Sequence, residues 1–421
     1  MTVLLELSNL LSLPAEKHTV MQTSLDLIIK ALNKKEQINC PFPVAIARVY
    51  LNKLVSNIAT IKQFAAEGKQ QSPSFLFPIK ANAYGSGMLA VAQFIEAKKI
   101  CSYFGVAHAN EAYQLRENGI KMPILIMSQT STCQKEMDYI IENNIEQTIS
   151  DLSLLLHLNE RAIQLNKVAS IHLLVDTGMG RCGVLIPGFN QLLDAIQACS
   201  HVKLVGVMTH LAVSSSLEKK NVKYTAQQIK QFIEIKKQIL SKFDRKDLIF
   251  HAANSGGAMG NRSSVFDMIR PGIATYGYPE HDMGLGLQPI MDVVSRISLI
   301  KTFPKNCSIG YDCTYKTQKD NERIAIVPIG YGDGLSRALS NQLTPIVNGK
   351  KVKSIGVVSM DQVTILVDDE TKIGDEVIII GQAGGVKNDA YDLAEQAAAI
   401  TYEVICNLGA ASRIRHEYVL V

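Results

Sequence analysis

Short apolar runs alternate with segments of helical period between residues 75 and 277. The apolar runs are, in chain order, FLFPI, YFGVA, PILIM, EQTIS, SIHLLVD, LVGVMTH, LIFHAA and MIRPGIATYG. Amphipathic segments such as DLSLLLHLNERAIQLN separate them. Strands that alternate with helices of roughly 10–20 residues predict parallel β-α units. Eight such units fit a closed (β/α)8 TIM barrel, and an open doubly wound sheet is the alternative.

The pattern changes after about residue 285. The runs RIAIVPIGYGDG, TPIVNGKKVKSIGVVSM and QVTILVDDETKIGDEVIIIG carry turn dipeptides and no long helix between them, and one helix, YDLAEQAAAITYEVICNL, follows. We therefore expect an α/β protein with a barrel at residues 43–284 and a mainly-β domain at residues 285–421. Residues 1–42 form an N-terminal extension without a clear role.

Composition narrows the class of protein. The net charge is +4 and the basic clusters are short, without interleaved aromatic residues, so a nucleic-acid partner is not expected. Eight cysteines at irregular spacings, without CxxC, argue against a metal site and against a disulfide scaffold.

The sequence also lacks the marks of a membrane or exported protein. No run of 18 uncharged apolar residues predicts a membrane span. MTVLLELSNLLSLPAEK carries Glu6 in its apolar part and no basic start, which predicts a short amphipathic helix and not a signal peptide. We expect a cytoplasmic protein.

Polar residues follow the predicted barrel strands where an active site would lie, because barrel enzymes build their sites at the carboxyl ends of the strands. Lys80 closes the first strand. The others are Asp176 and Arg181 after the fifth strand, His210 at the end of the sixth, His251, Asn254 and Ser255 after the seventh, and Arg270 and Gly272 on the eighth. A single such residue is more often a solvated cap, but a set that converges on one face is harder to explain in that way.

Two loops in this set predict a phosphate site. Barrels often bind phosphate with the loops after strands seven and eight, which here read NSGGA and PGIA. Their small residues let backbone N–H groups approach an anion, although Gly272 could also be a bend forced by Pro271. Phosphate together with Lys80 suggests pyridoxal 5'-phosphate, whose aldehyde forms a Schiff base with a lysine amine.

These residues carry a resemblance to a known family. PIKANAYGSG resembles the cofactor-lysine motif of bacterial alanine racemases, which are pyridoxal-phosphate-dependent isomerases of fold type III. DTGMGRCG, VMTHLA, ANSGGA, RPGIATYG, GYDCTY, PIGYGDGLSR, VSMDQ and TYEVIC resemble the family's other blocks in the family's order, across roughly residues 43–421. The resemblance implies a homodimer with shared active sites that racemises alanine and supplies D-alanine for peptidoglycan.

The resemblance also implies residue roles. Lys80 would hold the cofactor as an internal aldimine and act as one acid/base group, and Tyr311 of the partner subunit would act as the other. The cofactor phosphate would be held by Tyr84, Ser255, Tyr402 and the N–H groups of Gly272 and Ile273. Arg270 would face the ring nitrogen, and His210 would lie beside the cofactor, hydrogen-bonded towards Tyr311. The substrate carboxylate would be positioned by Arg181 together with Met360 of the partner subunit.

Two departures from the family keep alternatives open. Leu174 stands where many members have a carbamylated lysine that orients the arginine, so another group or an anion must hold Arg181. Asp312 stands where alanine racemases usually have glycine. Both changes resemble broad-specificity amino-acid racemases.

Two further alternatives stay open. One is a related barrel decarboxylase with Cys313 as its acid. The other is a non-catalytic barrel that binds pyridoxal phosphate, although such proteins lack a C-terminal β domain.

Overall fold

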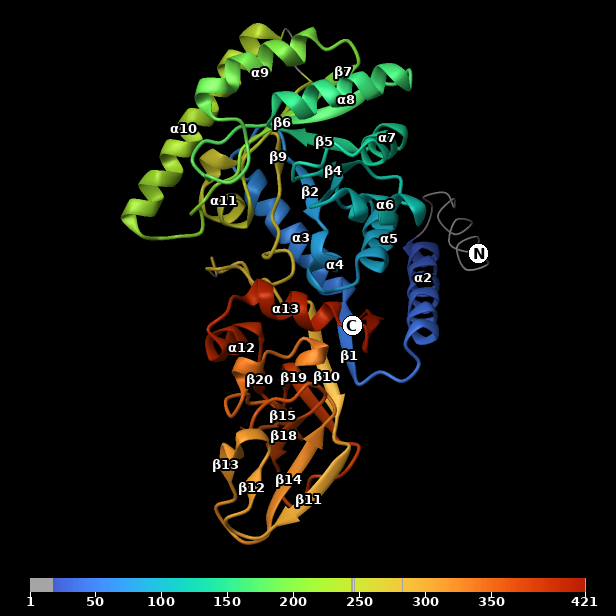
Figure 1. Cartoon of the computed structure of the whole chain (residues 1–421), viewed down its shortest axis with the longest axis vertical. Coiled ribbons are helices and arrows are strands. Elements are labelled where there is room, and N and C mark those ends of the chain that lie inside the picture. The colour runs from blue at the N-terminus through green and yellow to red at the C-terminus, as the bar shows by residue number, and fades with distance from the viewer. Residues whose placement is uncertain (1–17, 244, 246, 282, 421) are drawn as a thin grey trace. The chain divides into compact units, whose positions relative to one another are not determined.

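A computed structural model describes residues 18–420 of the chain except 244, 246 and 282 (Figure 1). The amphipathic helix expected at residues 1–17 lies outside the described residues. The chain divides into two compact units. The barrel unit comprises residues 55–80 and 95–287, and the β unit comprises residues 81–94 and 288–421 with the described part of residues 1–54. The domain limits expected at residues 42 and 284 stay predictions.

The barrel unit contains eight parallel strands that pair in chain order, as the alternating pattern predicts. They are β2 (Ser74–Pro78), β3 (Tyr103–Val106), β4 (Ile124–Ile126), β5 (Glu146–Ile149), β6 (Ala169–Leu174), β7 (Val202–Met208), β8 (Ile249–His251) and β9 (Met268–Ile269). β9 pairs with β2, and two backbone bonds join the β8 and β9 segments, from Asp267 N–H to Phe250 O (2.9 Å) and from Arg270 N–H to Ala253 O (2.8 Å). The expected (β/α)8 barrel is therefore confirmed.

The eighth strand is much shorter than its apolar run. The run was expected to continue to Gly277, but β9 ends at Ile269. Pro271 has no N–H to donate to a ladder. Beyond it the backbone turns, with Thr275 N–H donating to Gly272 O and Tyr276 N–H donating to Ile273 O. The apolar character of this segment reflects burial in a turn and not a strand.

Helices surround the barrel strands (Figure 1). They are α3 (Leu51–Ala66), α6 (Ala109–Glu117), α7 (Gln134–Glu142), α8 (Leu152–Gln164), α9 (Ile186–Ala198), α10 (Lys219–Lys242), α11 (Ser255–Gly260) and the 3-10 turn η1 (Arg262–Ser264). The helix α5 (Met88–Lys98) belongs mostly to the β unit. Side chains from α8, α9 and α10 pack on the outer faces of the strands, with Leu155, Leu192 and Phe232 buried in one cluster. This packing fixes the strand ends from which the candidate site is built.

The β unit holds three sheets. Its large sheet has the order β16-β15-β19-β10-β1-β21, with β20 paired to β19; a second sheet is β11-β14-β18-β17, and β12 pairs with β13. The strands are β1 (Ala45–Tyr50), β10 (Met291–Arg296), β11 (Leu299–Phe303), β12 (Ser308–Ile309), β13 (Tyr315–Lys316), β14 (Glu322–Val327), β15 (Ile346–Val347), β16 (Lys350–Lys351), β17 (Ser354–Ile355), β18 (Val363–Leu366), β19 (Glu376–Ala383), β20 (Val386–Asn388) and β21 (Ile414–Val419). The expected mainly-β domain is confirmed.

The helices of the β unit are short, apart from one at its N-terminal end. They are α2 (His18–Asn39), α4 (Lys80–Tyr84, which begins at the last residue of the barrel segment), η2 (Tyr311–Cys313), η3 (Tyr331–Asp333), η4 (Arg337–Leu339), α12 (Ala390–Ala397) and α13 (Thr401–Ala410). The single helix expected near the C-terminus is divided, because Ala398 adopts a left-handed conformation (φ 51°) that ends α12. Tyr402 consequently lies in the first turn of a separate helix.

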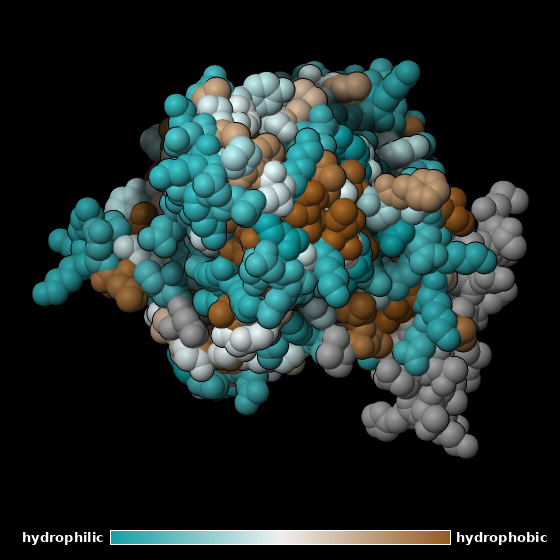
Figure 2. Space-filling view, turned by 90° about the horizontal axis from the view of Figure 1, so that it is seen from below, coloured by the Kyte–Doolittle hydropathy of each residue, from teal (hydrophilic) through white to brown (hydrophobic). Residues whose placement is uncertain are grey.

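The surface is mixed in character. Figure 2 shows small apolar patches between mostly hydrophilic side chains on the face that it views. Among the described residues, no helix is both long and apolar enough to cross a membrane.

Candidate functional site

A small cavity lies at the carboxyl ends of the barrel strands. Lys80, Arg181, His210 and Arg270 line it together with apolar groups that include Leu174. The three charged side chains in this lining are all cationic, so the cavity favours an anionic ligand such as a carboxylate or a phosphate. Four of the residues predicted from separate strand ends are thus brought together.

His210 is neutral in this surrounding. Burial, followed by the positive charges of Arg270, Arg181 and Lys80, lowers the pKa of its imidazole to about 3. The ring can therefore exchange hydrogen bonds at the cavity without adding a fourth positive charge.

Arg270 is almost fully buried and begins a line of hydrogen bonds inside the barrel. Its Nη1 lies 2.8 Å from His251 Nδ1, and its Nη2 donates to Thr209 O (2.8 Å) and Ala252 O (3.2 Å). Burial lowers the pKa of the guanidinium to about 10, so the group stays protonated at neutral pH. Three of its five N–H groups have these partners. The other two have no acceptor among the described residues and are available to a ligand.

The line continues through two histidines to a carboxylate. A guanidinium can only donate, so His251 Nδ1 accepts and His251 Nε2 donates to His172 Nδ1 at 2.8 Å. His172 Nε2 then donates to Glu146 Oε2 at 2.7 Å. Burial, helped by Arg270, keeps the pKa of His251 well below its usual value. His172 and Glu146 were not predicted as site residues; their only signal is polar character inside apolar strands.

Backbone N–H groups after β9 form a cradle for an anion. Gly272 and Ile273 are buried, and within the described residues neither of their N–H groups has an acceptor. Ser255 Oγ lies beside them, since it accepts from Ala274 N–H at 3.3 Å. Buried N–H groups are nearly always paired, so two adjacent unpaired ones fit a bound phosphate group.

Arg181 is held through its loop and not through its side chain. Leu174 faces an apolar cluster with Leu76 and Met208. The Arg181 side chain is exposed and makes no hydrogen bond among the described residues. Its loop is nevertheless ordered by Asp176, whose carboxylate accepts from the N–H groups of Gly178, Met179 and Gly180.

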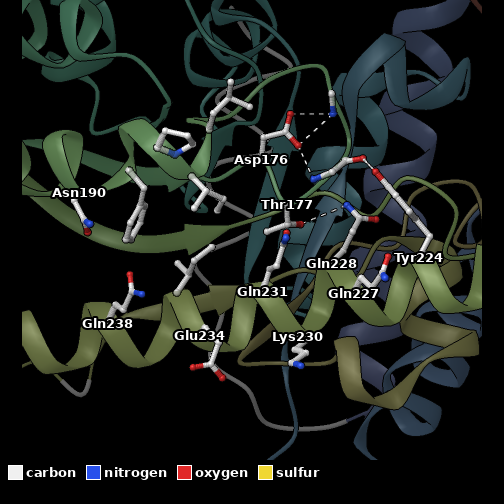
Figure 3. Close-up of a pocket in the computed structure, with 17 residues that line it drawn as sticks. Asp176, Thr177, Asn190, Tyr224, Gln227, Gln228, Lys230, Gln231, Glu234 and Gln238 are labelled. Carbon is white, nitrogen blue, oxygen red and sulfur yellow. Dashed lines mark hydrogen bonds between the residues drawn. The ribbon is translucent and has the colours of Figure 1, made fainter.

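The helix α10 braces the same loop from outside the barrel (Figure 3). Tyr224 Oη donates to Gly178 O at 2.6 Å. Gln228, only 1% exposed, donates to Thr177 Oγ1 (3.4 Å) and His210 O (3.1 Å) and accepts from Ala212 N–H (3.0 Å). Gln228 therefore joins the loop that carries Arg181 to the loop that carries His210.

We expect Gln228→Leu to lower kcat/KM by about tenfold, because it leaves buried groups on both loops unpaired, at a cost of about 1–3 kcal/mol. Steady-state kinetics of the racemisation that the resemblance implies would measure this effect. The neighbouring Gln227→Leu is the matched control, since Gln227 is exposed on the same helix. Equal activity of the two variants would show that the brace does not position the loops.

The other predicted residues belong to the β unit. Tyr84 ends α4 and is buried, and its ring centroid lies 6.1 Å from that of Tyr402. Ala81, Asn82, Ala83 and Tyr84 all have φ between 51° and 55°. The left-handed conformation costs a residue with a side chain about 1–2 kcal/mol, so this turn is strained and must be held by its surroundings.

Tyr311 and Met360 are exposed in the single chain, at 68% and 52%. Tyr311 begins η2, where Asp312 has φ 57°. Glycine adopts this conformation without strain, and aspartate tolerates it better than most residues do. Asp312 therefore keeps the backbone conformation that glycine would give.

Comparison with known proteins adds an independent finding. The alanine racemase N-terminal domain family matches residues 49–280, and the alanine racemase C-terminal domain family matches residues 290–418. An alanine racemase of Symbiobacterium thermophilum is 35% identical over 368 residues, which cover 86% of this chain and 94% of that protein. One from Clostridium perfringens strain SM101 is also 35% identical over 368 residues, covering 86% and 92%.

Solved structures agree with these sequence matches. The alanine racemase from Bacillus anthracis with bound L-Ala-P has a TM-score of 0.80 and 28% identity, covering 90% of this chain and 95% of that one. The alanine racemase from Bartonella henselae with covalently bound pyridoxal phosphate has a TM-score of 0.75 and 25% identity, covering 89% and 99%.

Proposed function

Because the chain belongs to the alanine racemase family, we propose that it interconverts L-alanine and D-alanine by a two-base mechanism with Lys80 and Tyr311 of the partner subunit. The observation that carries this proposal is the cationic cavity at the end of β2, where Lys80, Arg181 and Arg270 meet. We further propose that the D-alanine supplies peptidoglycan synthesis in the cytoplasm. None of the eight cysteines, all of which lie within the described residues, is in a disulfide, as is usual in a reducing compartment.

The residues of the barrel unit fit pyridoxal 5'-phosphate. Lys80 would bind it covalently, and the N–H groups of Gly272 and Ile273 with Ser255 would hold its phosphate. Tyr84 and Tyr402, expected at the phosphate from the resemblance, stay predictions. When bound, the cofactor withdraws electrons from the amino acid and makes its α-proton acidic.

Arg270 has two N–H groups available for the ring nitrogen of the cofactor. A guanidinium donates and does not release its proton readily, so Arg270 would keep that nitrogen unprotonated. An unprotonated ring withdraws electrons less strongly, which disfavours transamination. This choice of residue supports racemisation over the other reactions of the same cofactor.

Racemisation needs acid/base groups on both faces of the α-carbon. The Lys80 amine would take or return the proton on one face and the Tyr311 phenol of the partner subunit on the other. Arg181 would hold the substrate carboxylate through its positive charge, with Met360 of the partner subunit beside it. The neutral His210 imidazole would bond towards the phenol without competing for the substrate anion.

A homodimer with shared sites follows from these roles. Tyr311 and Met360 are large side chains that a single chain leaves exposed. Such residues are more often covered when they act in a site. We propose that a second copy covers them and that each subunit completes the site of the other.

The proposal is tested by racemisation of a panel of L-amino acids by the purified protein with pyridoxal phosphate, read by chiral chromatography. We expect alanine to be strongly preferred and Lys80→Ala to be inactive with every substrate. Comparable rates with serine, lysine or arginine would identify a broad-specificity amino-acid racemase instead. Leu174 and Asp312 would then be the positions to revert first, since they resemble that branch.

A further inference from the structure

The helix α2 lies before both family matches, which span residues 49–280 and 290–418, yet it is packed within the β unit. Ile28, Ile29 and Leu32 are 3%, 9% and 4% exposed, so one face of the helix is buried. Gln37, one turn after Asn33, is exposed. The helix α2 is therefore part of the folded β unit.

Asn33 joins α2 to the edge strand β21. Its amide nitrogen donates to Tyr418 O at 2.9 Å, and its amide oxygen accepts from Tyr418 N–H at 2.8 Å. β21 is the last strand of the large sheet, so Asn33 supplies the two bonds that a neighbouring strand would make. Glu36 Oε2 also lies 4.0 Å from His416 Nδ1 on the same strand.

The side chains of β21 in turn hold the loop that follows the strained turn. His416 Nε2 donates to Gly85 O at 2.8 Å, and the Tyr418 ring stacks on the His416 ring at 6.1 Å. Tyr418 Oη lies so close to Gly87 that a Cβ at position 87 would overlap it. All of these groups belong to the β unit.

The loop closes the left-handed turn from Ala81 to Tyr84. The N–H groups of Gly85, Ser86 and Gly87 donate to the carbonyls of Ala81, Ala83 and Asn82, at 2.9–3.0 Å. Met88 N–H donates to Asn82 Oδ1 at 2.8 Å. A strained turn keeps its conformation only while such bonds are held in place. In the chain, this turn directly follows Lys80.

We propose that α2 is a positioning element, which acts through Asn33, Tyr418 and His416 to hold the Ala81–Tyr84 turn in its left-handed conformation. Its effect on cofactor retention rests on the proposed function, because only then does Lys80 bind the cofactor. Its effect on the turn itself is independent of any activity.

Hydrogen–deuterium exchange of the amides of residues 85–88 tests the proposal, in full-length protein with and without the cofactor. Asn33→Leu removes both bonds to Tyr418. Gln37→Leu is the matched control, because Gln37 is an exposed amide side chain on the same helix. We expect Asn33→Leu to speed exchange of these amides about tenfold, as the loss of a hydrogen-bonded contact allows, and Gln37→Leu to leave it unchanged. Asn33→Asp keeps the acceptor for Tyr418 N–H but sets a carboxylate oxygen against Tyr418 O, so exchange should be at least as fast as in Asn33→Leu.

Cofactor release gives a second readout. We expect pyridoxal phosphate to dissociate several-fold faster from Asn33→Leu than from Gln37→Leu, followed by loss of its absorbance. Faster exchange within α2 with no change at residues 85–88 would overturn the proposal. Faster exchange at residues 85–88 in a protein that does not racemise alanine would support the positioning role of α2 and contradict only the proposed function. If Asn33→Leu does not fold, Asn33→Asp decides between these outcomes.

Discussion

Tyr311→Phe should lower racemisation by about 10²–10⁴-fold while leaving the absorbance of the bound cofactor unchanged. The substitution removes one hydroxyl from a side chain that is 68% exposed in the single chain, so the subunit itself should fold normally. In deuterated water, exchange of the α-proton should be lost from one enantiomer of alanine and kept from the other, since Lys80 still serves its own face. NMR of the recovered alanine measures both rates.

Tyr391→Phe is the control for this prediction, because Tyr391 is a partly exposed tyrosine of the same unit with no predicted role. It should keep full activity. Loss of exchange from both enantiomers in Tyr311→Phe, or from neither, would contradict the assignment of two bases to two faces.

Mixed dimers should regain activity that neither parent has. Lys80→Ala and Tyr311→Phe are each expected to be nearly inactive, yet a heterodimer of the two has one site with both residues intact. Random mixing should restore about a quarter of the wild-type activity, since half of the dimers are mixed and each has one good site. Differently tagged subunits allow the heterodimers to be purified, and these should show about half of the wild-type activity.

The control mixes Lys80→Ala with Arg270→Ala. Both residues belong to the barrel unit of one chain, so neither site of such a heterodimer is intact and no activity should return. Verified Lys80→Ala/Tyr311→Phe heterodimers that stay inactive would refute the shared site. Recovery in the control pair would show that Arg270→Ala keeps activity by itself or that Lys80 and Arg270 serve different sites.

The sequence predicts the barrel well because its strands are buried on both faces and read as apolar runs. FLFPI, for example, ends one residue after β2, and Lys80 follows in the cavity. The same rule overextends β9, since an apolar run cannot distinguish a strand from a buried turn after Pro271. The sequence also does not predict the break at Ala398, because alanine gives no sign that it will adopt a left-handed conformation there.

Contacts that depend on strand register were beyond the sequence alone. Glu146 and His172 meet only because β5 and β6 are neighbours in a parallel ladder, in which Gln147 pairs with Ile171. The sequence could not single out Gln228 either, because the neighbouring Gln227 has the same side chain and is exposed to solvent. The ordered motifs identified the family, whereas the groups that position its residues required the structure.

The hydrogen-bonded line from Arg270 to Glu146 acts as a barrier to protons. Each ring accepts at Nδ1 and donates at Nε2, away from Arg270, so a proton could pass from the cavity to Glu146 only if Arg270 gave its own proton to His251. This transfer is unfavourable, because the pKa of Arg270 is about 10 and burial keeps the pKa of His251 well below its usual value. The protons that the proposed reaction exchanges therefore do not travel along this line.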